Sequence, residues 1–177
     1  MIDPKTKAIA RNYAFRLLRE RPRSEKEMRS RLKLKGFDSE HIDDVVASLK
    51  KAGQIDDSKF AKFFMESRMH MNPVGDIVLK HDLKRKGIEP KIIEQVIDDK
   101  HLNYNELDTA LKMAEERFKR LKGLDRKKAS KRIYDFLLRR GFEYDTVRRV
   151  IEKLAVSMPQ RGSIQLDQDE GEVDEVS

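Results

Sequence analysis

Three glycines mark an internal repeat that limits what this chain can fold into. Gly36, Gly87 and Gly141 lie 51 and 54 residues apart, each directly after a basic residue and directly before a large apolar one. A leucine stands four residues before each glycine, and an apolar stripe at helical spacing begins six residues after it. At least seven aligned positions share their chemistry, which chance would rarely produce. The chain is therefore predicted to fold as copies of one small unit.

Each unit is predicted to contain three helices, because its apolar residues recur at helical rather than alternating spacing. The basic residue before the glycine ends one helix, the glycine takes the left-handed conformation, and the next apolar residue folds back onto that helix. A further helix then begins, with Asp38 as the predicted N-cap in the first unit and Pro90 at the first position in the second. Another amphipathic segment precedes each glycine helix, and Ser24 with Glu27 forms a predicted capping box for the first of these glycine helices.

The predicted fold is all-α, with three tandem three-helix repeats. We place the repeats at residues 1–53, 54–102 and 103–158, followed by a disordered acidic tail over 159–177. A unit of about 50 residues buries too little apolar surface to be stable alone, so neighbouring units are expected to extend one another's cores. The expected shape is an elongated, curved array, either right-angled or solenoid-like.

The charge balance favours a polyanionic partner or an acidic protein surface. Charged residues make up 40% of the chain and hydrophobic ones 38%, and the formal net charge is +7. The last eleven residues hold six acids and no base, so the body before them carries +13. The lack of cysteine excludes disulfides, thiolate zinc sites and thiol nucleophiles, and no apolar run reaches the roughly 18 residues of a membrane span. We expect a cytoplasmic protein that does not enter a membrane.

No residue pattern indicates catalysis. The four histidines never pair at the i, i+4 spacing of a helical metal site, and no two glycines are close enough for a phosphate-binding loop. Neighbouring aspartates such as Asp56 and Asp57 do not face each other on a helix and are interpreted as caps. We therefore predict no enzyme activity, no cofactor, no metal and no small-molecule substrate, and we expect the histidines at surface or boundary positions.

Basic residues gather on the second helix of each unit. The densest cluster covers residues 126–140, where seven bases accompany one acid, Asp135. Charged faces also keep a thin-cored protein soluble, and this alternative stays open for the first two clusters. The repulsion within the third cluster is better explained by a phosphate backbone or an acidic groove. The candidate binding residues are Lys84, Arg85, Lys86, Arg126, Lys127, Lys128, Lys131, Arg132, Arg139 and Arg140.

A helix, a glycine turn and a further helix could also form a helix-turn-helix. Acids such as Asp43 and Asp98 on the would-be recognition helices of the first two units would repel phosphates, and only the third unit, with Arg148 and Arg149, could enter a groove. Sequence-specific reading of bases is therefore not expected. Contact with a nucleic-acid backbone stays open. Tyr104, Tyr134 and Tyr144 flank the third unit and could stack on single-stranded bases, although core packing is the favoured interpretation for the aromatic residues.

Two stretches carry a family resemblance. The second unit contains IDDSKFAKFFMESR followed by IVLKHDLKRKGI, and the first contains SEKEMRSRLKLKGF. Both resemble the RecX family, the regulators of the RecA recombinase, over roughly residues 8–155. Asp82 stands where that family tends to have glutamate, and the loop MHMNPVG replaces a glycine-containing basic loop. The matching positions are Ser24, Glu27, Met28, Leu32, Lys35, Gly36, Phe37, Asp56, Asp57, Lys59, Phe60, Ala61, Arg68, Leu83, Lys86, Gly87 and Ile88.

The resemblance implies three tandem three-helix units that lie along the groove of a RecA filament on single-stranded DNA. It also implies inhibition of filament growth and of the ATPase, strand-exchange and coprotease activities of RecA, within DNA repair, recombination and the SOS response. The expected partners are RecA and its filaments, with weak DNA binding and a monomeric state. Two alternatives stay open: an independent, sequence-nonspecific DNA-binding repeat, and a helical scaffold for an acidic protein. The acidic tail is interpreted either as a competitor of DNA for the basic face or as a solubilising segment.

Overall fold

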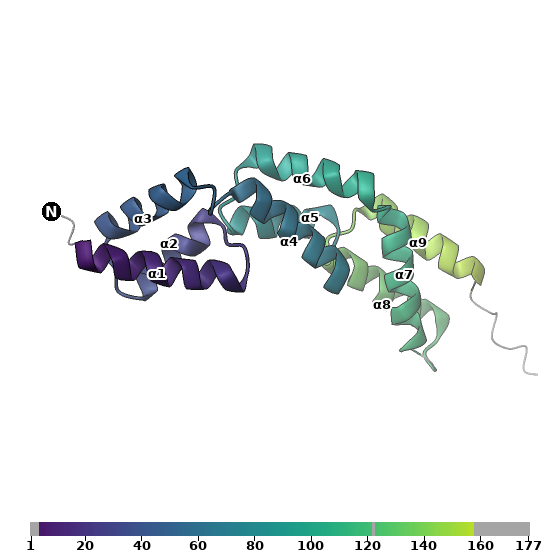
Figure 1. Cartoon of the computed structure of the whole chain (residues 1–177). Coiled ribbons are helices and arrows are strands. Elements are labelled where there is room, and N and C mark those ends of the chain that lie inside the picture. Colours follow the sequence, from purple (N-terminus) through teal and green to yellow (C-terminus); the bar gives the residue numbers. More distant parts are fainter. Residues whose placement is uncertain (1–3, 122, 158–177) are drawn as a thin grey trace, which may run out of the picture.

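The computed structural model describes residues 4–121 and 123–157, and this part of the chain contains nine α-helices and no strand. Consecutive helices form a first unit (α1–α3), a second unit (α4–α6) and a third unit (α7–α9) (Figure 1). The predicted tail over 159–177 lies outside the described residues. The helices are α1 (Pro4–Glu20), α2 (Glu25–Leu34), α3 (Ser39–Lys51), α4 (Asp57–Met71), α5 (Asp76–Arg85), α6 (Pro90–Asn103), α7 (Glu106–Lys119), α8 (Arg126–Arg139) and α9 (Tyr144–Ser157).

Each unit packs around its own apolar core, so the expectation that neighbouring units extend one another's cores is wrong. The units follow one another along an elongated body that bends at α7 (Figure 1). The prediction of an all-α fold with three tandem three-helix repeats is therefore confirmed. The second helix of each unit contributes the apolar residues that lie four and eight positions before the glycine. These fully buried residues are Met28, Leu32, Leu79, Leu83, Ile133 and Leu137.

The three repeat glycines end the second helices as predicted. Gly36, Gly87 and Gly141 have φ angles of +94°, +84° and +82°, in the left-handed region that favours glycine. The amide of the residue after each glycine donates to the carbonyl of the leucine five positions earlier, as Phe37 does to Leu32 at 3.3 Å. This hydrogen bond belongs to the Schellman motif, which satisfies carbonyl groups that the helix end would otherwise leave free.

Two local predictions are wrong in part. Ser24 caps α2, because its hydroxyl oxygen accepts from the Glu27 amide at 3.2 Å, but the Glu27 carboxylate pairs with Lys86 of the second unit instead of returning to Ser24. The capping box is therefore half formed. His41, expected at a surface or boundary position, is buried on α3. Its Nδ1 lies 2.7 Å from the Asp38 carboxylate that caps the same helix, and this contact makes the buried position tolerable.

Candidate functional site

The junction between the second and third units joins the ends of two helices. The Gly75 amide at the start of α5 donates to the Arg140 carbonyl at 2.9 Å, and the Ile77 amide donates to the Gly141 carbonyl at 3.2 Å. The free amides of one helix start thus satisfy the free carbonyls of another helix end. A Cβ added to Gly75 would lie 2.1 Å from the Gly141 carbonyl oxygen, and one added to Gly141 would lie 2.5 Å from the Val78 amide nitrogen. The two backbones are therefore too close for a side chain at either glycine.

The junction between the first and second units uses equivalent positions. Ser24 at the start of α2 lies 51 residues before Gly75, and its hydroxyl donates to the Lys86 carbonyl at the end of α5 at 2.8 Å. A Cβ added to Gly87 would lie 2.7 Å from the Cβ of Lys26. Gly87 and Gly141 therefore have a second role besides forming the turn. Because they have no side chain, the neighbouring unit can pack closely against the helix end.

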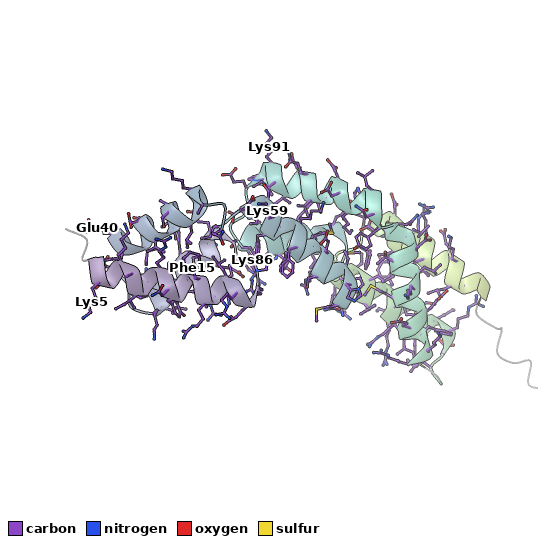
Figure 2. The ribbon with its side chains drawn as sticks, viewed as in Figure 1. Lys5, Phe15, Glu40, Lys59, Lys86 and Lys91 are labelled. Carbon is purple, nitrogen blue, oxygen red and sulfur yellow. The ribbon has the colours of Figure 1, made fainter. Side chains whose placement is uncertain are left out.

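Charged side chains add to this first junction. The Glu27 carboxylate lies 2.9 Å from an Arg21 guanidinium nitrogen and also pairs with the Lys86 ammonium. Lys86 is labelled in Figure 2, between the first and second units. Burial would raise the pKa of Glu27, but hydrogen bonds from Arg21 and Lys86 outweigh burial and lower that pKa. The Glu25 amide donates to the Asp57 carboxylate at 2.8 Å, which ties α2 to the start of α4.

The two junctions place the three second helices end to end in the order α8, α5, α2. In this row the carboxyl end of one helix meets the amino end of the next, so their peptide dipoles attract. Gly36 ends α2 at the outer end of the row, and a Cβ there would meet nothing within 4 Å. The same turn therefore carries a packing role at Gly87 and Gly141 but not at Gly36.

A buried ionic cluster supports the bend between the second and third units. Lys100 of α6 is fully buried, and its ammonium lies 2.5 Å from Asp76 at the start of α5 and 3.5 Å from Glu106 at the start of α7. The other Asp76 oxygen lies 2.6 Å from His101 Nε2. Burial alone would raise the pKa of Asp76, but hydrogen bonds and attraction from Lys100 and His101 outweigh burial and lower the pKa. Three helices from two units thus meet at one set of paired charges.

The basic cluster of the third unit forms an exposed face on α8. This basic face consists of Lys128, Lys131, Arg132 and Arg139, which share one side of the helix by their spacing and are all exposed. None of the four side-chain cations lies within 4.0 Å of a carboxylate among the described residues, although Asp135 shares their side. The helix has 14 residues where α2 and α5 have 10, and the extra first turn begins at Arg126.

The remaining candidate binding residues divide between free surface positions and structural contacts. Lys84 and Lys127 are exposed, and their ammonium groups lie within 4.0 Å of no carboxylate in the described ranges. Arg85 lies 3.4 Å from Asp82, and Lys86 pairs with Glu27. Arg126 donates to the Ala155 carbonyl, and Arg140 donates to the Asn72 side chain. Two of the ten candidates, Lys86 and Arg140, are therefore parts of the junctions.

Hollows flank the junctions, and no sequence pattern indicated the one between the second and third units. The first, of about 290 Å³, lies beside α2 and is lined by Arg21, Lys26, Arg31 and others. The second, of about 330 Å³, lies where the second unit meets the third and includes Arg117 of α7 and Arg120, the residue that follows α7. Arg117 and Arg120 belong to none of the basic clusters on the second helices, so only the fold reveals that they gather with Arg140.

The tyrosines differ in their surroundings. Tyr104 packs against the core of the second unit, and Tyr134 packs against that of the third. Tyr144 is 61% exposed and makes an edge contact with Tyr134, with ring centroids 6.3 Å apart. Within residues 4–121 and 123–157, no group of three or more acidic or histidine side chains is placed to hold a metal ion. No helix in those ranges is long and apolar enough to cross a membrane.

Comparison with known proteins supports all three units of the repeat. Models of the first, second and third three-helix domains of RecX match residues 10–49, 56–97 and 104–151. A regulatory protein RecX from Chlorobium phaeobacteroides is 36% identical over 143 residues, which cover 81% of this chain and 91% of the relative. A regulatory protein RecX from Chlorobaculum tepidum is 32% identical over 167 residues, which cover 94% of this chain and all of the relative.

Solved structures agree on the fold. The crystal structure of RecX from Lactobacillus salivarius has a TM-score of 0.70 and 23% identity, covering 85% of this chain and 97% of that one. The helix order, the three cores and the two end-to-end junctions define an all-helical tandem-repeat protein. With its three matching domains, the chain belongs to the RecX family of regulatory proteins.

Proposed function

We propose that this protein binds RecA filaments on single-stranded DNA and restrains RecA by limiting filament extension. The ATPase, recombinase and coprotease activities of RecA would fall together, because all three depend on the filament. The observation that carries the proposal is the match of three consecutive RecX domains along the chain. The protein would act in the cytoplasm as a monomer, by binding and without catalysing a reaction.

The geometry supports such a role in two ways. The end-to-end junctions hold the three units in an elongated body, which suits a protein that contacts several neighbouring subunits of a filament (Figure 1). The basic face of α8 presents four exposed cations beside a single acid, Asp135, which suits contact with a phosphate backbone near the filament axis.

A second candidate function is sequence-nonspecific DNA binding without RecA. The exposed cations of the basic face favour it, since they lack carboxylate partners within 4.0 Å in the described part of the chain. Such binding would weaken by about tenfold or more between low and moderate salt, because each phosphate contact releases counterions.

The test is the ATPase rate of RecA filaments preassembled on single-stranded DNA, titrated with this protein below one molecule per RecA. The titration is repeated with excess naked DNA as a competitor. A fall in rate far below equal stoichiometry, resistant to the competitor, is the expected result. An unchanged rate, or inhibition that naked DNA abolishes, would contradict a filament-directed role and leave the DNA-binding alternative.

A further inference from the structure

The hollow between the second and third units combines arginine with apolar side chains. It is lined by Arg117 and Arg120 in and just after α7, by Arg140 at the end of α8, and by the apolar Phe136, Met113 and Met71. Met71 at the end of α4 is 80% exposed, so the rim of the hollow offers apolar surface to solvent. We name this set the junction hollow.

Two arginines of the junction hollow, Arg117 and Arg140, are held in place without being neutralised. The guanidinium carbons of Arg117 and Arg140 lie 5.4 and 5.3 Å from the centroid of the Phe136 ring, within the range of a cation–π contact. Arg140 also donates to the Asn72 side chain, which is uncharged. Stacking of this kind orders a guanidinium while leaving most of its N–H donors available.

No carboxylate of the described ranges lies within 4.0 Å of Arg117, Arg120 or Arg140, although Glu116 also lines the hollow. The Nε atom of Arg117 is shielded from solvent and donates to no partner there. A shielded donor without an acceptor is costly, and a ligand carrying an oxyanion would supply the missing acceptor. The planar fork of arginine suits a carboxylate in particular, because two parallel hydrogen bonds form at once.

The composition of the junction hollow distinguishes a protein ligand from nucleic acid. Its lining contains three arginines, two methionines and a phenylalanine, and no lysine. Arginine, methionine and aromatic residues are enriched at protein interfaces, whereas lysine is depleted there. The basic face of α8, by contrast, has two lysines, Lys128 and Lys131, beside its two arginines, which suits contact with a phosphate backbone.

We propose that the junction hollow docks an acidic segment of a protein partner, in which a carboxylate side chain stands next to an apolar one. The carboxylate meets Arg117 and Arg120, and the apolar side chain packs on Phe136 and Met71. This inference deepens the proposed function by separating a protein-binding site at the hollow from a nucleic-acid-binding face on α8. Only the identification of RecA as that protein partner depends on the proposed function.

The test compares two variants of the full chain that each lose two positive charges. R117Q/R120Q alters the junction hollow, and K127Q/K128Q alters the start of α8 as a control matched in charge. Each is titrated against RecA without DNA, against labelled oligo(dT), and against a short fluorescein-labelled peptide of repeated Glu-Glu-Leu triplets. Thermal unfolding of both variants checks that they fold like the wild type.

The hollow variant is expected to lose about tenfold or more in affinity for RecA and for the peptide, since arginine is among the residues that carry most of the binding energy at protein interfaces. Its affinity for oligo(dT) should stay within about twofold of the wild type, and the control should show the reverse pattern. Equal losses by both variants on RecA and the peptide would overturn the proposal, because net charge would then explain the binding. An unchanged hollow variant, or a selective loss of oligo(dT) binding, would overturn it too.

The peptide separates this proposal from the proposed function. If the wild type binds the peptide through the hollow but does not bind RecA, the hollow is a carboxylate site and the role in regulating RecA is wrong. If the wild type binds neither probe, the junction hollow is not a docking site for acidic segments and the inference is refuted.

Discussion

Replacing Gly75 with alanine would separate the second unit from the third without straining the backbone at the substituted position. The backbone there has φ −74° and ψ 172°, which any residue adopts, so alanine would ordinarily stabilise by about 0.4–1 kcal/mol through the unfolded chain. In the folded protein the new Cβ would lie 2.1 to 2.4 Å from three backbone atoms of Gly141 and Phe142. These are backbone atoms, which cannot rotate out of the way as the end of a flexible side chain can. The helix α5 must therefore move away from α8.

The loss of stability comes from the hydrogen bonds that break when α5 moves away from α8. The amides of Gly75 and Ile77 lose their acceptors at the end of α8, and each hydrogen bond contributes about 0.5–1.5 kcal/mol net. The unfolded-chain effect of alanine offsets part of this loss, so the free energy of unfolding should fall by about 1–2 kcal/mol. Urea unfolding measures this loss, and small-angle X-ray scattering should show a changed maximum dimension because the angle between the units is released.

Gly36→Ala provides the control. Its φ of +94° makes alanine cost about 1–2 kcal/mol, but a Cβ there meets nothing within 4 Å, so the scattering curve should match that of the wild type. If Gly75→Ala keeps both the scattering curve and the stability of the wild type, the helix-end junction does not hold the units and the reasoning is refuted.

Further variants test the charged and polar contacts around the junctions. Lys100→Met leaves the buried Asp76 carboxylate without its main partner and should cost about 3–5 kcal/mol in urea unfolding, whereas a loss below about 1 kcal/mol would argue against a buried pair. Because the pKa of Asp76 is lowered in the folded state, its stabilising contribution is present above about pH 4 and is lost on further acidification. Asp76→Asn should therefore flatten the acid side of the curve of stability against pH. Ser24→Ala removes the cap of α2 and the hydrogen bond to the end of α5, and should lower the free energy of unfolding by about 1–2 kcal/mol; an unchanged urea midpoint would contradict this. Deletion of residues 162–177 removes all six terminal acids and should raise affinity for DNA at low salt, while unchanged affinity would leave the tail a solubilising role.

The helices and their turns could be predicted because their causes are local. The left-handed glycines, the Asp38 cap and the start of α6 at Pro90 all follow from residues within one turn of the position concerned. His41 was placed wrongly, because whether a polar ring is buried depends on the packing of α3 against other helices. Glu27 fits a capping box by spacing, but Lys86, 59 residues away, draws its carboxylate into an ion pair.

The sequence by itself determined the all-helical repeat, the family and the concentration of positive charge on the second helices. Only the tertiary structure decided that these helices lie end to end and that the glycine at the end of one also admits the start of the next. It also decided that Lys100 is buried in an ion pair and that Arg117 and Arg140 gather around Phe136. The physical reason is that periodicity and capping act over a few residues, whereas these contacts join backbone and side chains from separate helices. Which residues contact one another across the junctions therefore depends on how whole units pack together.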